Sequence, residues 1–504
     1  MTYAPRIPGS TAKVVSTQSR LSISRALNTL LSPLSSLLSP LLIMSFGATR
    51  PLARAFAPRV GRLPALSRPL CRNITTTPPA PINPSSAAHD GGNVEAPHNG
   101  INVDTPVRMD TAPTPAPGDD FPIVMVGAGN IMFGSQAGPW NHSFRIEHKL
   151  GPRLKVKALI DPDAARARGV LAKKCASFVE TAYKDTQVYP NIGEYAKALA
   201  TSGESGPRAI IVGTPPAFRG GVAEGRHLEL DLIKYFPTVG YFIEKPVSTA
   251  PIDEVKQVAA ELVKNKNVVS VGYMLRYLRC VQKMKQIIHD NNLTVMATNA
   301  RYSAAYQSID KPAWWDKSKD MGPVIEQGTH FCDLSRYFGG DVDISSVVAH
   351  SVEYDEAPGK LSAIPINESE IPEDQRIPRI TAAVWKYANG AVGSFTHTVA
   401  LQGTLYDCEL EVWADGYHMR LIDPYNAPQL LVRRPGDDHN ERHQFTDDDP
   451  FFSEMSAFID SVEGKPDSHI LSSFEDATKT YELTWAIRLA SEKSAAARRA
   501  TSKS

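Results

Sequence analysis

The strongest constraint on the fold is a repeated alternation of short apolar runs and amphipathic segments between residues 121 and 272. Four of the five runs are followed directly by Gly, Asp, Thr or Glu. Buried parallel strands have this continuous apolar character, and helical periods between them indicate βα units. We therefore expect a doubly wound parallel sheet whose ligands bind at the carboxyl ends of the strands. The expected strands are 121–126, 154–160, 209–213, 239–243 and 268–272.

The first run leads into a glycine-containing turn, Gly127-Ala-Gly129-Asn130-Ile131. Two glycines after a strand allow the backbone to approach a pyrophosphate closely at a helix start. The third glycine of the G-x-G-x-x-G pattern is replaced by Met132, so this turn alone is weak evidence for a dinucleotide.

Asp161 ends the second run, 34 residues after Gly127 where about 20 is usual. An insertion over 134–142, which interrupts or delays the first helix, accounts for the longer spacing. An acid in this place accepts hydrogen bonds from the adenosine ribose and repels a 2′-phosphate, which favours NAD over NADP. Arg166 and Arg168 lie nearby and keep NADP as an alternative. The other interpretation of Asp161 is a helix cap.

After residue 275 the pattern is that of an antiparallel sheet with helices on one face. Residues 381–387 and 391–398 flank Asn389-Gly390, a strong hairpin signal. Alternating strands with one covered face are typical of an open-faced, mainly antiparallel α/β domain. Further strands are expected over 404–410 and 412–421, and helices over 452–462 and 474–491.

The charge distribution separates the first 89 residues from the rest. The chain has 54 basic and 54 acidic residues, yet residues 1–89 contain ten basic residues and no acid. Arg-rich, Ser-rich, acid-free composition is typical of a mitochondrial transit segment. We therefore expect a mitochondrial (matrix) protein, with a cytoplasmic protein carrying a plain tail as the alternative. Met44 is an alternative translation start.

These features predict the domain organisation and exclude several partners. The remainder of the chain has 44 basic and 54 acidic residues, a net charge of 44 − 54 = −10, which argues against a nucleic-acid partner. No apolar run reaches 18 residues, so we expect no membrane span. The expected parts are a disordered leader and linker over 1–119, a Rossmann domain over 120–275, an α/β domain over 276–495 and a tail over 496–504.

Two further segments contain residues suited to acid–base chemistry. Thr214-Pro215 and Glu244-Lys245-Pro246 each follow an expected strand. In a helix over 325–336, Glu326, His330 and Asp333 would share one face at i, i+4 and i+7. A carboxylate beside an imidazole orients it and raises its basicity.

Two other roles remain for this trio. A structural hydrogen-bonded histidine is one of them. A metal site is the other, but no second His or Cys completes it, so we expect no metal.

Together these motifs resemble the Gfo/Idh/MocA oxidoreductases, which include glucose–fructose oxidoreductase and inositol dehydrogenase. The resemblance covers about residues 120–495. It rests on the strand-GAGN turn, Asp161, Gly213-Thr-Pro-Pro216, Glu244-Lys-Pro246, Gly272-Tyr-Met-Leu-Arg276-Tyr277 and Glu326-x-Gly-x-His330-x-x-Asp333.

The resemblance implies a Rossmann domain followed by an open-faced α/β domain, with NAD(P) in the cleft between them. Lys245 would reach the nicotinamide side and the substrate hydroxyl, and His330 would be the acid or base on that hydroxyl. Glu326 stands where the family usually has Asp, and Asp333 is the better-matched acid. The expected cofactor is NAD, with NADP as the alternative. Its expected binding residues are Gly127, Gly129, Asn130, Ile131, Asp161, Thr214, Pro215, Glu244 and Lys245.

The expected function is hydride transfer between a nicotinamide and a secondary alcohol or carbonyl of a sugar, polyol or related cyclic substrate. The alternatives are a non-catalytic NAD(P)-binding regulator and an NAD-dependent glycosidase. By resemblance, the chain forms homo-oligomers through the open sheet face. Several residues are expected either to line the substrate pocket or to pack the domain: Arg276, Tyr277, Tyr302, Trp314 and Trp315.

Overall fold

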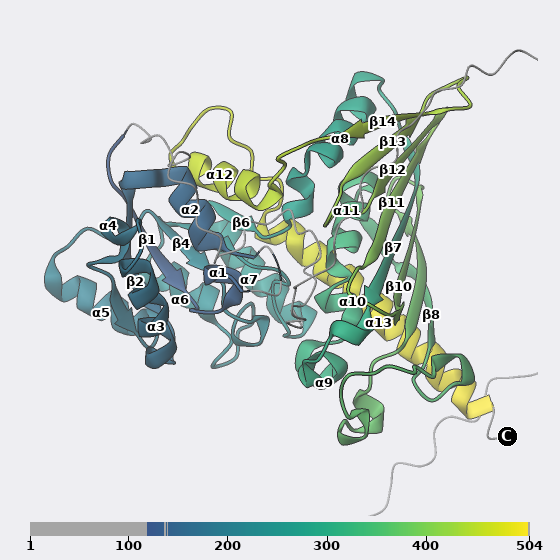
Figure 1. Cartoon of the computed structure of the whole chain (residues 1–504), viewed down its shortest axis with the longest axis horizontal. Helices are drawn as coiled ribbons and strands as arrows, with labels where there is room; N and C mark the ends of the chain where they lie inside the picture. Colours follow the sequence, from purple (N-terminus) through teal and green to yellow (C-terminus); the bar gives the residue numbers. More distant parts are fainter. Residues whose placement is uncertain (1–117, 136–137, 139, 502–504) are drawn as a thin grey trace, which may run out of the picture. The chain divides into compact units, whose positions relative to one another are not determined.

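The structure is a computed structural model that describes residues 118–135, 138 and 140–501. The expected transit segment, the alternative start at Met44 and nearly all of the linker lie outside the described residues. The described part contains a six-stranded sheet and an eight-stranded sheet (Figure 1).

The first sheet is entirely parallel, which confirms the expected doubly wound fold. Its strand order is β3-β2-β1-β4-β5-β6, so the chain reverses direction across the sheet between β1 and β4. The apolar runs form buried strands because helices cover both faces. The strands are β1 Phe121–Val126, β2 Leu154–Ile160, β3 Gln187–Tyr189, β4 Ala209–Val212, β5 Gly240–Ile243 and β6 Val269–Val271.

The first helix of this domain is divided, as the insertion predicts. Helix α1 comprises only Asn130–Phe133, and α2 begins at His142 and ends at Leu150. The side chain of Asn141 caps α2 by accepting a hydrogen bond from the backbone N–H of Phe144. The remaining helices are α3 Ala164–Cys175, α4 Glu180–Tyr183, α5 Ile192–Ser202, α6 Leu228–Tyr235 and α7 Ile252–Lys264.

The second sheet is mainly antiparallel, with one parallel pair between β7 and β10. Its order is β14-β13-β12-β11-β7-β10-β9-β8. The boundary expected between residues 410 and 412 is wrong, because the chain turns at Asp415-Gly416 instead, where Gly416 has a φ of 71°. The strands are β7 Val295–Ala305, β8 Val342–Val352, β9 Ile380–Tyr387, β10 Val392–Leu401, β11 Asp407–Ala414, β12 Tyr417–Ile422, β13 Gln429–Arg433 and β14 Asn440–Gln444.

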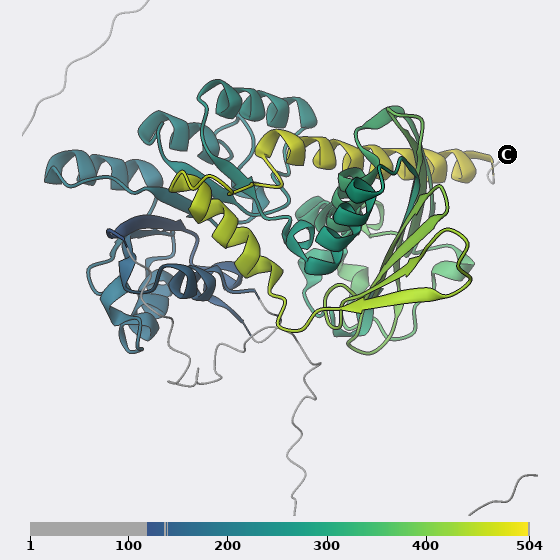
Figure 2. The same ribbon diagram turned by 90° about the horizontal axis from the view of Figure 1, so that it is seen from above.

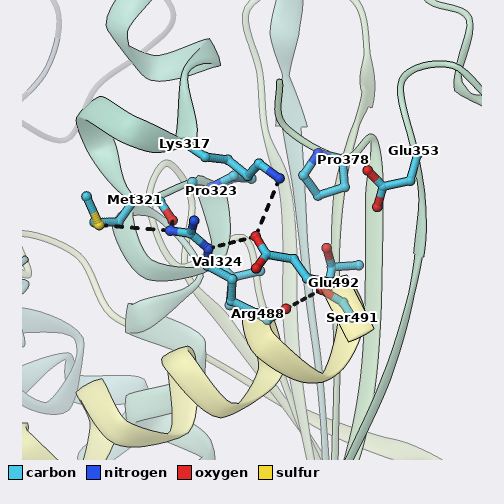
Figure 3. Close-up of a pocket in the computed structure, with 11 residues that line it drawn as sticks. Lys317, Met321, Pro323, Val324, Glu353, Pro378, Arg488, Ser491 and Glu492 are labelled. Carbon is cyan, nitrogen blue, oxygen red and sulfur yellow. Dashed lines mark hydrogen bonds and ion pairs between the residues drawn. The ribbon is translucent and has the colours of Figure 1, made fainter. Parts of the chain in front are cut away.

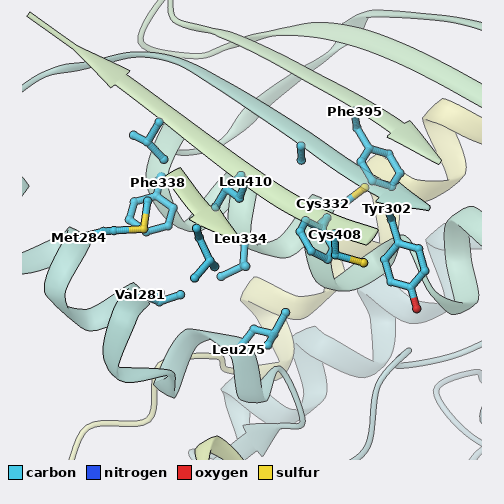
Figure 4. Packing of buried hydrophobic residues seen from close by; sticks show 14 of the residues in the cluster. Leu275, Val281, Met284, Tyr302, Cys332, Leu334, Phe338, Phe395, Cys408 and Leu410 are labelled. Atoms are coloured by element: carbon cyan, nitrogen blue, oxygen red, sulfur yellow. The ribbon is translucent and has the colours of Figure 1, made fainter. Parts of the chain in front are cut away.

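Helices cover one face of the second sheet, as Figures 1 and 2 show. These are α8 Arg279–Asp290, α11 Thr329–Gly339 and part of α13 Phe474–Thr501. Apolar side chains from the helices and strands fill the space between them (Figure 4). Alternate residues of β9 are buried and accessible, so no helix of the described residues covers the opposite face of the sheet.

Two C-terminal helices complete the core of the first domain. Met455, Phe458 and Ile459 of α12 (Pro450–Val462) pack with strands β1 and β2. Phe474 and Tyr481 of α13 pack against the other side of the same sheet. The later turns of α13 belong to the core of the second domain, and the helix continues to Thr501, past the boundary expected at residue 495. None of the described helices is long and apolar enough to cross a membrane.

Candidate active site

The glycine turn and the loop after β4 meet at the carboxyl edge of the first sheet. Gly127 has a φ of 99°, and a Cβ placed on it would lie 3.1 Å from the backbone of Thr214. Ile131 packs against Gly213, and a Cβ added to Gly213 would lie 3.1 Å from Cγ2 of Ile131. Larger residues would therefore separate these two loops. Gly129 instead borders open space, with no atom within 4 Å of an added Cβ.

Asp161 is bound to the glycine turn by its own carboxylate. One oxygen accepts a hydrogen bond of 2.7 Å from the N–H of Ala128, and the other accepts from the N–H of Asp163 at 2.8 Å. The cap of α3 is Asp163 rather than Asp161. Asp161 is nearly buried and forms a 3.2 Å ion pair with Arg166, whose side chain is half exposed. The acid expected at the end of β2 is therefore present, and the guanidinium of Arg166 lies beside it.

These residues fit a dinucleotide such as NAD. Gly129 leaves backbone accessible beside the short helix that starts at Asn130, and Gly127 lets the turn lie against the loop after β4. The hydroxyl of Thr214 is buried and lacks a partner within the described part of the chain. Pro215 follows it at an exposed position. Buried hydroxyls are normally hydrogen-bonded, so a ligand at this edge would satisfy Thr214.

Glu244 faces away from this edge and into the protein. One of its oxygens lies 2.5 Å from Nε2 of His142, and the other accepts a hydrogen bond from the N–H of Lys245 at 3.1 Å. His142 is almost fully buried between Phe242 and Phe451. The pair fixes the backbone from which the Lys245 side chain extends.

The side chain of Lys245 crosses to the second domain. Its Nζ donates a 3.0 Å hydrogen bond to the backbone oxygen of Glu326 and lies 3.9 Å from the carboxylate of the same residue. The peptide bond between Lys245 and Pro246 is cis. Lys245 and Glu326, predicted from separate motifs, are therefore neighbours.

The single helix expected over 325–336 is wrong. Helix α10 covers Pro323–Glu326, and α11 starts at Thr329. At Gly328 an added Cβ would come within 2.8 Å of the backbone oxygen of Val324 and 2.9 Å of the Phe395 ring. The chain can make this close bend because Gly328 has no side chain.

His330 lies in the first turn of α11 and is almost fully buried. Its Nδ1 has no hydrogen-bond partner among the described residues. The rings of Tyr273 and Tyr425 contact it edge to face, with centroids 6.0 and 6.2 Å away. Burial and, secondly, the charge of Lys245 hold the pKa of His330 well below its ordinary value. The imidazole is therefore neutral at physiological pH.

Asp333 pairs with Arg276 rather than with His330. The guanidinium donates two hydrogen bonds to it, of 2.6 and 2.7 Å, and also binds Asp476 at 2.6 Å. Burial raises the pKa of Asp333, and Arg276 opposes that shift. The expected orientation of the imidazole by a neighbouring carboxylate is not what the structure shows, and this acid instead ties α11 to α13.

The residues expected to line a substrate pocket divide into two groups. Trp314 donates a 3.3 Å hydrogen bond to the Glu326 carboxylate, and Tyr302 stacks on His397 with centroids 5.2 Å apart. Both therefore lie beside the candidate site. The others serve packing: Arg276 binds the two acids, Tyr277 accepts from the N–H of Leu471, and Trp315 donates to the carbonyl of Ile309.

Sequence reasoning missed three residues that the structure brings to this region: His142, Arg219 and Tyr425. Arg219 is fully buried and donates 2.9 Å hydrogen bonds to the carbonyls of Thr214 and Val247. No spacing rule marks these residues, because their partners come from other elements of the fold. Only the position of Arg219 shortly after Thr214-Pro215 offered a signal.

A small pocket lies elsewhere, beside α10 (Figure 3). Three of its four charged residues bind one another: Glu492 binds Arg488 at 3.0 Å and Lys317 at 3.4 Å, and Arg488 also donates to the carbonyl of Met321. Neither Lys245 nor His330 lines it. This pocket is therefore separate from Lys245 and His330. Within the described ranges, no group of three or more His, Cys, Asp or Glu side chains is arranged to hold a metal ion.

Comparison with known proteins agrees with this architecture. The family model described as "Oxidoreductase family, NAD-binding Rossmann fold" (GFO_IDH_MocA) matches residues 121–273, and a model of an oxidoreductase C-terminal domain matches residues 276–417. The uncharacterized protein UNK4.17 of Schizosaccharomyces pombe is 47% identical over 378 residues, which cover 75% of this chain and 93% of that protein.

Solved structures share the fold at low sequence identity. The UDP-N-acetylglucosamine 3-dehydrogenase GnnA from Acidithiobacillus ferrooxidans is 14% identical with a TM-score of 0.54, over 74% of this chain and 98% of that one. An oxidoreductase from Agrobacterium radiobacter, solved with NAD+, L-tartaric acid and magnesium, is 12% identical with a TM-score of 0.54, over 74% and 96%. On its sequence matches and its two-domain architecture, the chain belongs to the Gfo/Idh/MocA oxidoreductases, with an NAD-binding Rossmann domain followed by the C-terminal oxidoreductase domain.

Proposed function

We propose that this NAD(P)-dependent oxidoreductase transfers hydride between a nicotinamide and a secondary alcohol or carbonyl of a sugar, polyol or related cyclic compound. The observation that supports it most is the position of Lys245, which hydrogen-bonds Glu326 of the second domain and whose charge helps to keep the buried His330 neutral. GnnA, which shares the fold, is by its name a dehydrogenase of a sugar nucleotide.

The two side chains suit the two demands of alcohol oxidation. A neutral imidazole can accept the hydroxyl proton, and the ammonium of Lys245 stabilises the negative oxygen that is left. When bound, the nicotinamide supplies the acceptor for the hydride. The hydrogen bond from Lys245 to the Glu326 carbonyl fixes the position of the ammonium while leaving two of its protons free to contact a substrate oxygen.

The cofactor would be held by residues that the structure gathers at one sheet edge. Gly127, Gly129, Asn130 and Ile131 would face the pyrophosphate, and Asp161 the adenosine ribose. Thr214 and Pro215 would lie toward the nicotinamide, followed by Lys245. Glu244 would act indirectly, through the backbone of Lys245.

The direct test is turnover with NAD or NADP against a panel of polyols and sugars, followed by absorbance of the reduced cofactor. We expect His330→Ala and Lys245→Ala each to lower kcat about 10²–10⁴-fold, because each removes a group that acts on the reacting oxygen. NAD affinity, measured by calorimetry, should change little in His330→Ala.

Several outcomes would count against the proposal. Wild-type turnover in both variants would remove the assigned roles. Reduced cofactor that never accumulates, with cleavage of a glycosidic bond, would indicate an NAD-dependent glycosidase. NAD binding without turnover on any alcohol or carbonyl would favour the regulatory alternative.

We also infer mitochondrial import from the acid-free segment over 1–89. The ten basic residues of that segment would be drawn toward the negative matrix side of the inner membrane. Microscopy of the full chain tagged at its C-terminus tests this, and a diffuse cytosolic signal would contradict it.

A further inference from the structure

Tyr425 lies in the connection between β12 and β13 and is directed at α11 by ring contacts. Its ring meets those of His330 and Phe331 edge to face, with centroids 6.2 and 6.4 Å away, and that of Tyr302 at 6.1 Å. The connection itself is fixed by Asp423, whose carboxylate accepts from the N–H of Ala427 at 3.1 Å. The phenol is thus held in place beside the proposed acid–base residue.

The hydroxyl of Tyr425 is buried and has no hydrogen-bond partner in the described part of the chain. Three other buried phenols of this protein are bonded: Tyr241 donates to the carbonyl of Phe236, Tyr387 to that of Ser335, and Tyr481 to that of Ala250. A buried polar group without a partner is costly and is normally satisfied by protein, water or ligand. Nδ1 of the neighbouring His330 is a second such atom.

The surroundings keep this hydroxyl protonated and therefore able to donate. Burial raises the pKa of Tyr425 well above its ordinary value, and Cys408, the carboxylate of Glu326 and Tyr406 add to the shift. Burial likewise raises the pKa of Tyr302, and Glu326 is among the groups that add to that shift. Two neutral phenols therefore lie side by side within electrostatic reach of Glu326, and one of them, Tyr425, contacts His330.

We propose that Tyr425 contacts substrate, donating a hydrogen bond to a second oxygen next to the one that reacts at His330. The inference rests on the proposed oxidoreductase function and narrows it to compounds with oxygens on neighbouring carbons. Because the phenol and the imidazole are edge-to-face neighbours, one ring substrate with vicinal hydroxyls spans both groups. A mono-alcohol would leave the phenol unsatisfied, and sites of this kind reject such analogues strongly.

The test is Tyr425→Phe, which removes only the partnerless oxygen. For a vicinal diol such as a cyclic polyol we expect kcat/KM to fall about 10–100-fold, with unchanged NAD affinity and unchanged or higher stability to denaturant. For the matching mono-alcohol the variant and the wild type should be equally poor. Loss of activity without loss of stability is a result that a purely structural tyrosine would not give.

Two matched variants serve as controls. Tyr195→Phe removes another buried, partnerless phenol, on α5 in the first domain, and should change neither stability nor kinetics. Tyr387→Phe removes a hydroxyl bonded to Thr298 and Ser335, and should lower stability while kcat/KM stays at the wild-type value.

Calorimetric binding of the same diol to the NADH-loaded enzyme separates the inference from the function on which it rests. If the wild type binds the diol without turning it over, and Tyr425→Phe binds it more weakly, the result would overturn the oxidoreductase assignment and support the contact. If Tyr425→Phe keeps the wild-type kcat/KM and the wild-type affinity for the diol, the proposed contact would be overturned and the oxidoreductase function would stand. Absence of both binding and turnover across the panel would overturn both.

Discussion

At the scale of single residues, the imidazole of His330 lies in a dry environment beside the charge of Lys245. Both effects oppose protonation, so its pKa lies well below the ordinary value of 6.5. The residue therefore stays in its base form at pH values where an exposed histidine would be half protonated. That state suits removal of a proton from an alcohol.

The pH dependence of turnover should show this shift. In the oxidation direction, kcat/KM should stay level as the pH falls from about 8 through 6.5, with the decline from this group appearing only below that point. The measurement is kcat/KM against pH with saturating NAD. An acid limb centred at the ordinary histidine pKa would show that His330 is not the base or that burial does not suppress its protonation.

We expect Asp161 to set the preference between the two nicotinamide cofactors. Its carboxylate already accepts from the backbone of the glycine turn, and Arg166 partly offsets its charge. We expect NAD to bind more tightly than NADP by calorimetry, because a 2′-phosphate would face this anion. Asp161→Asn should reduce the difference between the affinities for NAD and NADP. Tighter binding of NADP to the wild type would show that Arg166, rather than Asp161, sets the selectivity.

At the scale of elements, Arg219 joins the loops that follow β4 and β5. Its guanidinium donates to the carbonyls of Thr214 and Val247, so it fixes the spacing between a proposed cofactor contact and the Lys245 segment. Glu229, also fully buried, accepts a hydrogen bond from the N–H of Gly220 beside it. The rigid fork of an arginine can hold two carbonyls at once, which a lysine ammonium does poorly.

Arg219→Lys should therefore weaken NAD binding about 10-fold and lower the free energy of unfolding by about 1–3 kcal/mol. Calorimetry and denaturant unfolding measure the two effects. The matched control is Arg379→Lys in the second domain, where an equally buried guanidinium binds Glu368 and the carbonyl of Gly359. That variant should lose stability and keep its NAD affinity. Unchanged NAD binding in Arg219→Lys would show that the loops after β4 and β5 keep their spacing without the Arg219 hydrogen bonds.

The elements differed in how far the sequence could predict them. Continuous apolar runs defined five of the six parallel strands, since burial on both faces leaves little other choice of residue, whereas the short edge strand β3 has no such run and was missed. The break before α11 was missed because helical spacing suggested continuity, whereas the bend depends on contacts between Gly328 and the distant Phe395. Pairings such as Arg276 with Asp333 also join elements 57 residues apart, and no local pattern encodes them.

Short sequence motifs indicated part of the candidate site. Lys245 and His330 stand out because both belong to short motifs with recognisable spacing. His142 and Tyr425 have no such motif and depend on how α2 and the β12–β13 connection pack. Sequence could therefore indicate the proposed reacting groups but not the residues that position them.

At the scale of the whole molecule, the uncovered face of the eight-stranded sheet presents apolar side chains to solvent. Val348, Val384 and Trp413 are 54%, 45% and 42% exposed, and Val348 pairs with Val384 across neighbouring strands. Apolar sheet surfaces of this kind are commonly interfaces. A second copy of the chain would cover this face, as the expected homo-oligomer requires.

Light scattering should find the wild type as an oligomer and Val384→Lys/Trp413→Lys as a monomer. Both side chains face solvent in a single chain, so the substitutions should not disturb its fold. The control is Val263→Lys, an equally exposed valine on α7, which should leave assembly unchanged. A monomeric wild type at micromolar concentration would contradict an interface on this sheet.

The sharing of α12 and α13 between the domains has a consequence for biosynthesis. The Rossmann core contains Met455, Phe458, Phe474 and Tyr481, all of which are synthesised after β14, the last strand of the second sheet. The Rossmann domain therefore cannot reach its full core until the second sheet has also been synthesised, contrary to the usual N-terminal-first order. During that interval β1–β6 expose apolar surface, so nascent chains of this enzyme should depend on chaperones and should be vulnerable to premature termination.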